Sequence, residues 1–196
     1  TLKLNAAAVQ IPIGLEGIHE GVIDVVEQRS IRFHGERGET VVYGDIPEDL
    51  MEQVEEKRLE LIERLADVDD EIAEIFLMEE TPDIETLKAA IRRQTINCKF
   101  VPVFMGSAFK NKGVQPLLDG VVDYLPAPKE KENFALDRSK DEEPVKVSGN
   151  SDDPLLALAF KLDETQYGQL TYMRIYQGKL QKGNSITNVN SGKKVK

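Results

Sequence analysis

Apolar and polar residues form short alternating stretches over the first quarter of this 196-residue chain. An apolar run over 6–12 ends at Gly14 and predicts one strand that enters a turn. The next three apolar runs are short, rich in β-branched residues and separated by glycines, so they predict a small antiparallel meander. Their ranges are 21–26, 30–33 and 40–43.

After Pro47 the apolar spacing changes to that of an amphipathic helix, with acidic residues between the apolar ones. A second helix is predicted to restart at Asp69 and Asp70. A third is predicted near Thr81, where Thr81 can cap the helix and Pro82 suits its first position. The apolar residues of the three helices are Leu50, Val54, Leu61, Leu65 and Val68, then Ile72, Ile75 and Phe76, then Leu87 and Ile91.

A strand followed by a helix is predicted next. Residues 99–105 are almost continuously apolar, which fits a strand buried on both faces of a parallel sheet. A loop from Gly106 then leads to a helix that opens at Gly113 and ends at the Leu-Pro-Ala-Pro segment 125–128. The residues predicted to face the core from this helix are Leu117, Leu118, Val121 and Val122.

Two prolines, Pro126 and Pro128, mark a predicted domain boundary. Residues 129–153 are charged and poor in apolar side chains, so we predict a linker or a long mobile loop. From Pro154 onward, three strand-like runs separated by glycines predict antiparallel hairpins that are too few to close a barrel. These runs are 155–162, 170–177 and 185–189.

The formal net charge of -10 is concentrated in the first half of the chain. Residues 1–98 contain 10 basic and 23 acidic residues, whereas residues 99–196 contain 15 basic and 12 acidic residues. Nucleic-acid affinity comes largely from Lys and Arg that displace counterions, so the acidic half is a poor candidate for contact with a phosphate backbone. Any RNA contact is expected late in the chain, where Lys193, Lys194 and Lys196 lie.

The single cysteine, Cys98, excludes an intramolecular disulfide and a multi-cysteine zinc site. His19 and His34 lack a second nearby ligand or a partnered nucleophile, so neither is predicted to be catalytic or to bind a metal.

No apolar run approaches membrane-spanning length, and we expect a soluble chain with no membrane contact. The segment from Thr1 has no initiator Met and no signal-peptide layout, and we expect the natural chain to begin earlier.

Two segments imitate nucleotide-binding motifs but lack the required chemistry. A GTPase phosphate loop needs two glycines, a Lys that reaches the outer phosphates and a hydroxyl for magnesium. Residues 178–185 place Asn184 where that Lys belongs and run into a predicted strand, so we interpret them as a turn. Residues 111–114 begin like the guanine-specificity box Asn-Lys-x-Asp but lack its Asp. An Asp-x-x-Gly switch motif is also missing.

Residues 106–114, Gly-Ser-Ala-Phe-Lys-Asn-Lys-Gly-Val, resemble the fifth conserved box of the GTPase superfamily. In that family the Ala backbone N–H donates to the guanine carbonyl, and the Ser supports the Asp of the specificity box. The resemblance implies these roles for Ala108 and Ser107, while the Phe109 ring can pack beside the base or face the core. One such hydrogen bond contributes about 1 kcal/mol net, so the loop would tune base choice without supplying nucleotide affinity alone.

A wider match identifies the family. The segments 10–14, 21–24, 106–108, 111–119, 124–128, 154–155, 159–161 and 168–178 resemble elongation factor G, a translational GTPase, and residues 3–10 and 89–93 resemble its mitochondrial members. The resemblance implies an α/β plus β fold: the C-terminal end of a P-loop GTPase domain with an inserted α+β subdomain, then the first strands of a translation-factor β-barrel. The implied domains are 1–98 (leading GTPase strand and inserted subdomain), 99–128 (last strand, guanine loop and helix), 129–153 (linker) and 154–196 (partial barrel).

The resemblance implies an enzyme as the whole protein. It would be a GTPase that binds GTP or GDP with Mg²⁺ and drives ribosomal translocation of tRNA and mRNA in protein biosynthesis. Its location would be the mitochondrial matrix or, alternatively, the bacterial cytoplasm. The family's phosphate loop, switches, magnesium ligands and hydrolysis-associated histidine would precede Thr1. These 196 residues alone are therefore expected to hold no catalytic or metal-binding residue, to bind no cofactor and to lack GTPase activity.

The implied partner is the ribosome, through ribosomal RNA and the stalk protein, with the tRNA–mRNA complex contacted indirectly. In the family the inserted subdomain contacts the stalk protein, so an exposed acidic helix is a candidate docking face; a solvated face is the plainer interpretation. Two alternatives stay open: a relative specialised for ribosome recycling or ribosomal protection, and a non-catalytic ribosome-interaction module. The acidic residues concerned are Glu48, Asp49, Glu52, Glu55, Glu56, Glu60 and Glu63.

Overall fold

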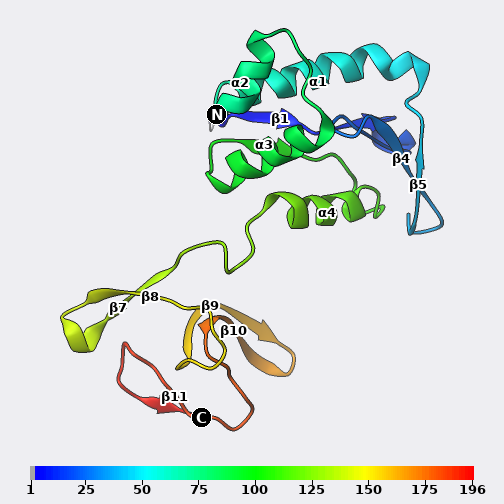
Figure 1. Cartoon of the computed structure of the whole chain (residues 1–196). Helices are drawn as coiled ribbons and strands as arrows, with labels where there is room; N and C mark the ends of the chain where they lie inside the picture. Colours follow the sequence, from blue (N-terminus) through cyan, green and yellow to red (C-terminus); the bar gives the residue numbers. More distant parts are fainter. Residues whose placement is uncertain (1–2) are drawn as a thin grey trace. The chain divides into compact units, whose positions relative to one another are not determined.

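The computed structural model describes residues 3–196, so Thr1 and Leu2, which begin the predicted domain 1–98, lie outside the described residues. The chain divides into two compact units, Thr1–Pro126 and Ala127–Lys196 (Figure 1). This division falls between the two prolines of the Leu-Pro-Ala-Pro segment. The architecture is mixed α/β with several sheets, which confirms the coarse part of the predicted fold class.

The first unit contains a parallel pair of strands and an antiparallel meander. The strands are β1 (Ala6–Ala8), β2 (Gln10–Ile13), β3 (Gly21–Asp24), β4 (Arg29–His34), β5 (Thr40–Gly44) and β6 (Val101–Val103). β1 pairs in parallel with β6, and the other four pair in the order β2-β3-β4-β5, which confirms the predicted meander. Val9 joins the two sheets, because its N–H donates to Val103 O and its carbonyl accepts from Val25 N–H, both at 3.0 Å.

Four helices complete the first unit: α1 (Met51–Ala66), α2 (Asp70–Leu77), α3 (Ile84–Ile96) and α4 (Val114–Tyr124). All four were predicted from apolar spacing, but the predicted cap of α3 was wrong. Asp83, not Thr81, is the N-cap, because its extended backbone places its carboxylate to accept from Thr86 N–H at 2.7 Å. None of the helices within residues 3–196 is long and apolar enough to cross a membrane.

One main core lies between the meander, the parallel pair and the helices. Its buried members include six of the ten apolar residues predicted for α1, α2 and α3, whereas Leu50, Val68 and Ile75 are half-buried and Phe76 is exposed. Arg58 of α1 is also buried, and its guanidinium donates to Val25 O at 2.9 Å and Val26 O at 2.8 Å. This arginine ties α1 to the turn after β3. The predicted residues confirmed in the core are Val54, Leu61, Leu65, Ile72, Leu87 and Ile91.

The buried face of α4 differs from the prediction. The buried residues are Pro116, Gly120 and Tyr124, spaced four apart, and Gly120 lets the helix approach so closely that a Cβ there would overlap the Phe104 ring. Because Gly and Pro do not stand out as apolar positions in the sequence pattern, the pattern predicted the wrong buried face for α4. The four residues predicted to be buried are exposed, Val122 to 77%: Leu117, Leu118, Val121 and Val122.

The prediction that β6 is buried on both faces was also wrong for the described residues. β1 is its one pairing partner within residues 3–196, and Val101 is 38% exposed. Phe100, immediately before the strand, is the residue of this run that enters the core. The predicted parallel pairing itself is confirmed.

The second unit consists of strand pairs. They are β7 (Phe134–Asp137) with β8 (Glu143–Lys146), β9 (Leu156–Thr165) with β10 (Gly168–Gln177), and β11 (Ile186–Thr187) with β12 (Lys194–Val195), all antiparallel. The three predicted strands correspond to β9, β10 and β11. The interpretation of 129–153 as a long mobile loop was wrong, because this segment contains the β7–β8 hairpin; its role as a linker stays a prediction. Its alternation of apolar residues is too short to stand out among the charges.

Candidate functional site

Residues 106–113, which we call the Ser-Ala loop, connect β6 to α4 and close as a tight hairpin. Ser107 N–H donates to Lys112 O at 2.7 Å, and Lys112 N–H donates to Ser107 O at 3.0 Å. Inside the hairpin, Asn111 N–H donates to Ala108 O at 3.1 Å, and Lys110 N–H donates to Ser107 Oγ at 3.4 Å. These bonds fix the backbone of the loop.

Glycines stand at both ends of the Ser-Ala loop, where its two arms touch. Gly113 has φ +87°, and a Cβ there would lie 2.6 Å from Met105 O. A Cβ on Gly106 would lie 2.7 Å from Lys112 O. A side chain at either position would push the arms apart, since Cβ atoms do not approach carbonyl oxygens this closely.

The three predicted site residues lie together on this loop. Ser107 is half-buried at its base, Ala108 is exposed, and the Phe109 side chain is 100% exposed. The interpretation that Phe109 faces the core is therefore wrong, whereas its packing beside a base remains a prediction. No acceptor within residues 3–196 takes the Ala108 N–H. The loop can thus offer a backbone donor and an aromatic ring to a ligand outside it.

The two imitations of nucleotide motifs have structural roles. Residues 111–114 close the hairpin and lead into α4. Residues 178–185 follow β10, contain Gly178 and Gly183 at positive φ, and run into the strand β11 instead of a helix. The interpretation of this segment as a turn is confirmed. Within residues 3–196, no group of three or more His, Cys, Asp or Glu side chains is placed to hold a metal ion.

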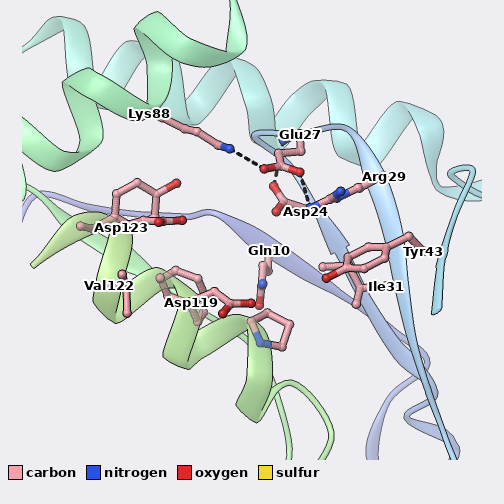
Figure 2. Close-up of a pocket in the computed structure, with 14 residues that line it drawn as sticks. Gln10, Asp24, Glu27, Arg29, Ile31, Tyr43, Lys88, Asp119, Val122 and Asp123 are labelled. Carbon is pink, nitrogen blue, oxygen red and sulfur yellow. Dashed lines mark hydrogen bonds and ion pairs between the residues drawn. The ribbon is translucent and has the colours of Figure 1, made fainter. Parts of the chain in front are cut away.

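A cavity of about 320 Å³ lies in the first unit and is separate from the three predicted site residues (Figure 2). It opens beside Gln10, which is 1% exposed and accepts from Met105 N–H at 3.3 Å through Oε1. No sequence pattern indicated this cavity, because its charged residues come from β3, the turn after it, β4, α3 and α4. They are Asp24, Glu27, Arg29, Lys88, Asp119 and Asp123.

Most of these charges serve the fold. Glu27 pairs with both Lys88 of α3 and Arg29 of β4 (Figure 2). Asp24 Oδ1 accepts from Val26 N–H and Glu27 N–H, each at 2.9 Å, and burial raises the pKa of Asp24. These contacts hold the turn after β3 against α3, so we assign the cavity a structural role.

A shallower hollow lies between α1 and α2. Its walls combine apolar side chains, among them Phe76 and Leu77, with charged ones from α1, among them Glu60 and Glu63. Leu77 is 81% exposed at the end of α2. A lining that combines exposed apolar side chains with acidic ones and Arg64 suits a protein partner with complementary chemistry. Seven acidic residues over 48–63 were considered above as a docking face, and Glu60 alone among them is half-buried. The Glu60 carboxylate pairs with Lys57 Nζ at 2.8 Å.

Comparison with known proteins gives a close sequence relative. No family model matches the chain. The chain is 56% identical over 195 residues to "Elongation factor G-1, mitochondrial" of Arabidopsis thaliana, a match that covers 100% of this chain and 26% of the relative. The predicted resemblance to elongation factor G of mitochondrial type is confirmed. The chain spans about a quarter of the length of this relative.

A solved structure supports the fold. A crystal structure of a protein from Thermus thermophilus has a TM-score of 0.69 and 26% sequence identity to this chain. The superposition covers 97% of this chain and 26% of that one. Both comparisons thus match nearly all of the 196 residues to about a quarter of a larger protein.

Proposed function

The chain is similar to mitochondrial elongation factor G along its whole length, and from this premise we propose that the whole protein is a GTP-dependent translation elongation factor. It would be a GTPase that couples hydrolysis to ribosomal translocation of tRNA and mRNA. The observation that carries the proposal is the 56% identity over 195 residues, which includes the Ser-Ala loop and both units.

We propose that β1, β6 and α4 belong to the end of a P-loop GTPase domain. Supporting this, β1 and β6 pair in parallel although about ninety residues separate them, and those residues form the meander and α1–α3. Such a topology is typical of an insertion between two strands of a parallel sheet. Residues 1–98 would hold the leading strand and the inserted subdomain, 99–128 the last strand and guanine loop, 129–153 the linker and 154–196 part of a β-barrel.

In the proposed site the Ser-Ala loop contacts the edge of the guanine base. Ala108 N–H would donate to the guanine carbonyl oxygen, Ser107 would support the Asp of a specificity box elsewhere in the protein, and Phe109 would pack beside the base. The exposed, unused Ala108 N–H supports this role. A backbone donor fixed by its own hairpin loses little entropy on binding, which favours discrimination between bases.

GTP or GDP with Mg²⁺ would be the cofactor of the whole protein. The described residues fit the guanine edge alone, since they hold neither a phosphate loop nor a group of metal ligands. Mg²⁺, when bound, would offset the negative charge that develops on the phosphates. We therefore expect the 196-residue chain by itself to show no GTPase activity.

The ribosome would be the partner. We propose that the hollow between α1 and α2 docks the stalk protein, because exposed apolar side chains lie there beside the acidic Glu60, Glu63 and Asp67. Ribosomal RNA would meet the second unit, where Lys193, Lys194 and Lys196 are exposed, and the tRNA–mRNA complex would be contacted indirectly. The mitochondrial name of the relative supports a mitochondrial location over the bacterial cytoplasm, and we propose the matrix as the compartment.

Measuring the affinity of the whole protein for fluorescent GDP tests the proposed guanine site. The expected result is that wild type binds fluorescent GDP and that Ala108→Pro, which removes the backbone N–H, weakens binding about fivefold, the equivalent of 1 kcal/mol. Val122→Ala, at an exposed position of α4, is the matched control and should leave affinity unchanged. Equal affinities of Ala108→Pro and wild type would remove the guanine-edge role.

Ribosome assays separate the alternative functions. A translocase moves the peptidyl-tRNA analogue from the A to the P site in a puromycin assay with GTP, whereas a recycling relative splits post-termination ribosomes and leaves the tRNA in place. A protection relative would instead restore translation in the presence of an inhibitor. Ribosome binding without guanine-nucleotide binding would favour the non-catalytic interaction module.

A further inference from the structure

Lysine side chains behind the Ser-Ala loop bind a turn of the meander. Lys110 Nζ donates to Gly17 O at 3.0 Å and to Glu16 O at 3.4 Å. Lys112 Nζ donates to His19 O at 2.7 Å. All three acceptors belong to the turn between β2 and β3, so this turn is tied to the loop at two points.

Two amide side chains bind the second meander turn on the same side. Asn111 Nδ2 donates to Arg37 O at 2.9 Å, and Gln115 Nε2, from the first turn of α4, donates to Gly38 O at 3.1 Å. The backbones also touch here, since a Cβ on Gly38 would lie 2.7 Å from Asn111 O. The turn between β4 and β5 is therefore packed directly against the loop.

Every acceptor in this set is a backbone carbonyl, and none is a carboxylate. The lysines thus do not form ion pairs here; they satisfy turn carbonyls that the strand ladders leave unpaired. The bonded residues are 74 to 94 positions apart in sequence. The loop is consequently held by a surface that its own flanking strand and helix do not provide.

We propose that Lys110, Asn111, Lys112 and Gln115 are positioning residues for guanine recognition. They hold the Ser-Ala loop against the meander so that the Ala108 N–H lies in line with the guanine carbonyl, without touching the base themselves. This inference rests on the proposed guanine-binding role of the loop. It makes the two meander turns part of the nucleotide site, and a shift of these turns would change the strength of base recognition.

The contacts between the Ser-Ala loop and the meander turns affect the strength of one hydrogen bond, that from Ala108 N–H to the guanine carbonyl. Hydrogen bonds weaken steeply when the donor angle falls, and a displacement of about 1 Å in a positioning element is enough to lose a large part of their benefit. Lys112 has the most direct effect, because its backbone closes the hairpin with Ser107 while its side chain binds His19 O. Removing its amine frees the hairpin to tilt.

A double-difference binding experiment on the whole protein tests the proposal. We would measure affinities for GDP and for 2-aminopurine riboside diphosphate, which lacks the carbonyl oxygen that Ala108 N–H would contact. The proteins are wild type, Lys112→Met, Lys110→Met and the conservative Lys112→Arg. Lys99→Met, at an exposed lysine before β6, is the control.

The expected result is that Lys112→Met weakens GDP binding about fivefold and leaves the analogue unaffected. Lys110→Met should act in the same direction, Lys112→Arg should restore most of the GDP affinity, and Lys99→Met should match wild type. Equal losses for both nucleotides, or no loss in either lysine variant, would overturn the positioning role. If wild-type protein itself fails to prefer GDP over the analogue, the guanine-edge function fails, and the two failures are thereby distinguished.

Discussion

Arg93 holds the Asp69 carboxylate with two parallel hydrogen bonds, from Nε to Oδ2 and from Nη2 to Oδ1, each 2.8 Å long. Asp69 is at the same time the N-cap of α2 and accepts from Ile72 N–H at 3.3 Å, while Gln94 Nε2 donates to its Oδ2 at 2.7 Å. One buried carboxylate therefore joins the start of α2 to the end of α3.

Removing the charge of Asp69 should destabilise this junction. Burial by itself would raise the pKa of Asp69, but hydrogen bonds from Arg93, Gln94 and Ile72 N–H lower it from 3.8 to about 2, a shift equivalent to about 2 kcal/mol. We expect Asp69→Asn to lower the opening free energy of α2 and α3 by that amount in native-state hydrogen exchange. Glu71→Gln, which removes the exposed partner of Arg93, should change it by less than about 0.5 kcal/mol.

The same carboxylate predicts a pH dependence. Because the pKa of Asp69 is lower in the folded than in the unfolded chain, its stabilisation is fully present above pH 3.8 and is lost as the pH falls towards about 2. Hydrogen exchange of α2 and α3 between about pH 4 and about pH 2 should show this loss in wild type. In Asp69→Asn the dependence should be smaller, and the remainder should come in part from Asp83, the N-cap of α3, whose pKa is lowered by hydrogen bonds from Thr86. An unchanged slope would show that carboxylates other than Asp69 govern acid opening.

The helices of the first unit could be predicted from sequence because their apolar spacing is long and regular. The buried face of α4 could not be predicted, since it contains Pro116 and Gly120, and the missing side chain of Gly120 permits the close approach of Phe104. The Asp69–Arg93 pair was also out of reach, because neither residue departs from the composition of a solvated helix end.

The candidate site also contains residues that the sequence could predict and residues that it could not. Ser107 and Ala108 could be found because a strand, a short dipeptide motif and a helix start occur in order. The anchoring role of Lys110 and Lys112 could not, because lysines in a loop ordinarily face solvent and their acceptors here are carbonyls of a turn about ninety residues away.

Arg58 should be the least replaceable charged residue of α1. Its guanidinium is buried and donates to three carbonyls, those of Val25, Val26 and, at 3.4 Å, Pro82. Arg58→Met keeps the apolar stem but leaves these acceptors unpaired, and we expect a loss of about 2–3 kcal/mol in the opening free energy of α1 and the turn after β3.

Arg64→Met is the control for this variant, since Arg64 lies on the exposed side of the same helix. It should change exchange by about 0.5 kcal/mol or less. Equal effects of the two substitutions would indicate that helix propensity, and not the carbonyl contacts of Arg58, determines the result.

Gly106→Ala should damage nucleotide binding without contacting the base. Its new Cβ would lie 2.7 Å from Lys112 O, which is backbone and cannot rotate away, so the hairpin must open and shift Ala108. We expect GDP affinity of the whole protein to fall about tenfold, with hydrogen exchange accelerated in the first turn of α4. Gly17→Ala, where a Cβ would meet nothing within 4 Å, keeps the carbonyl that Lys110 binds and should leave both measurements at wild-type values. If Gly106→Ala retained full GDP affinity, the close approach of the two loop arms would be unnecessary for the proposed guanine site.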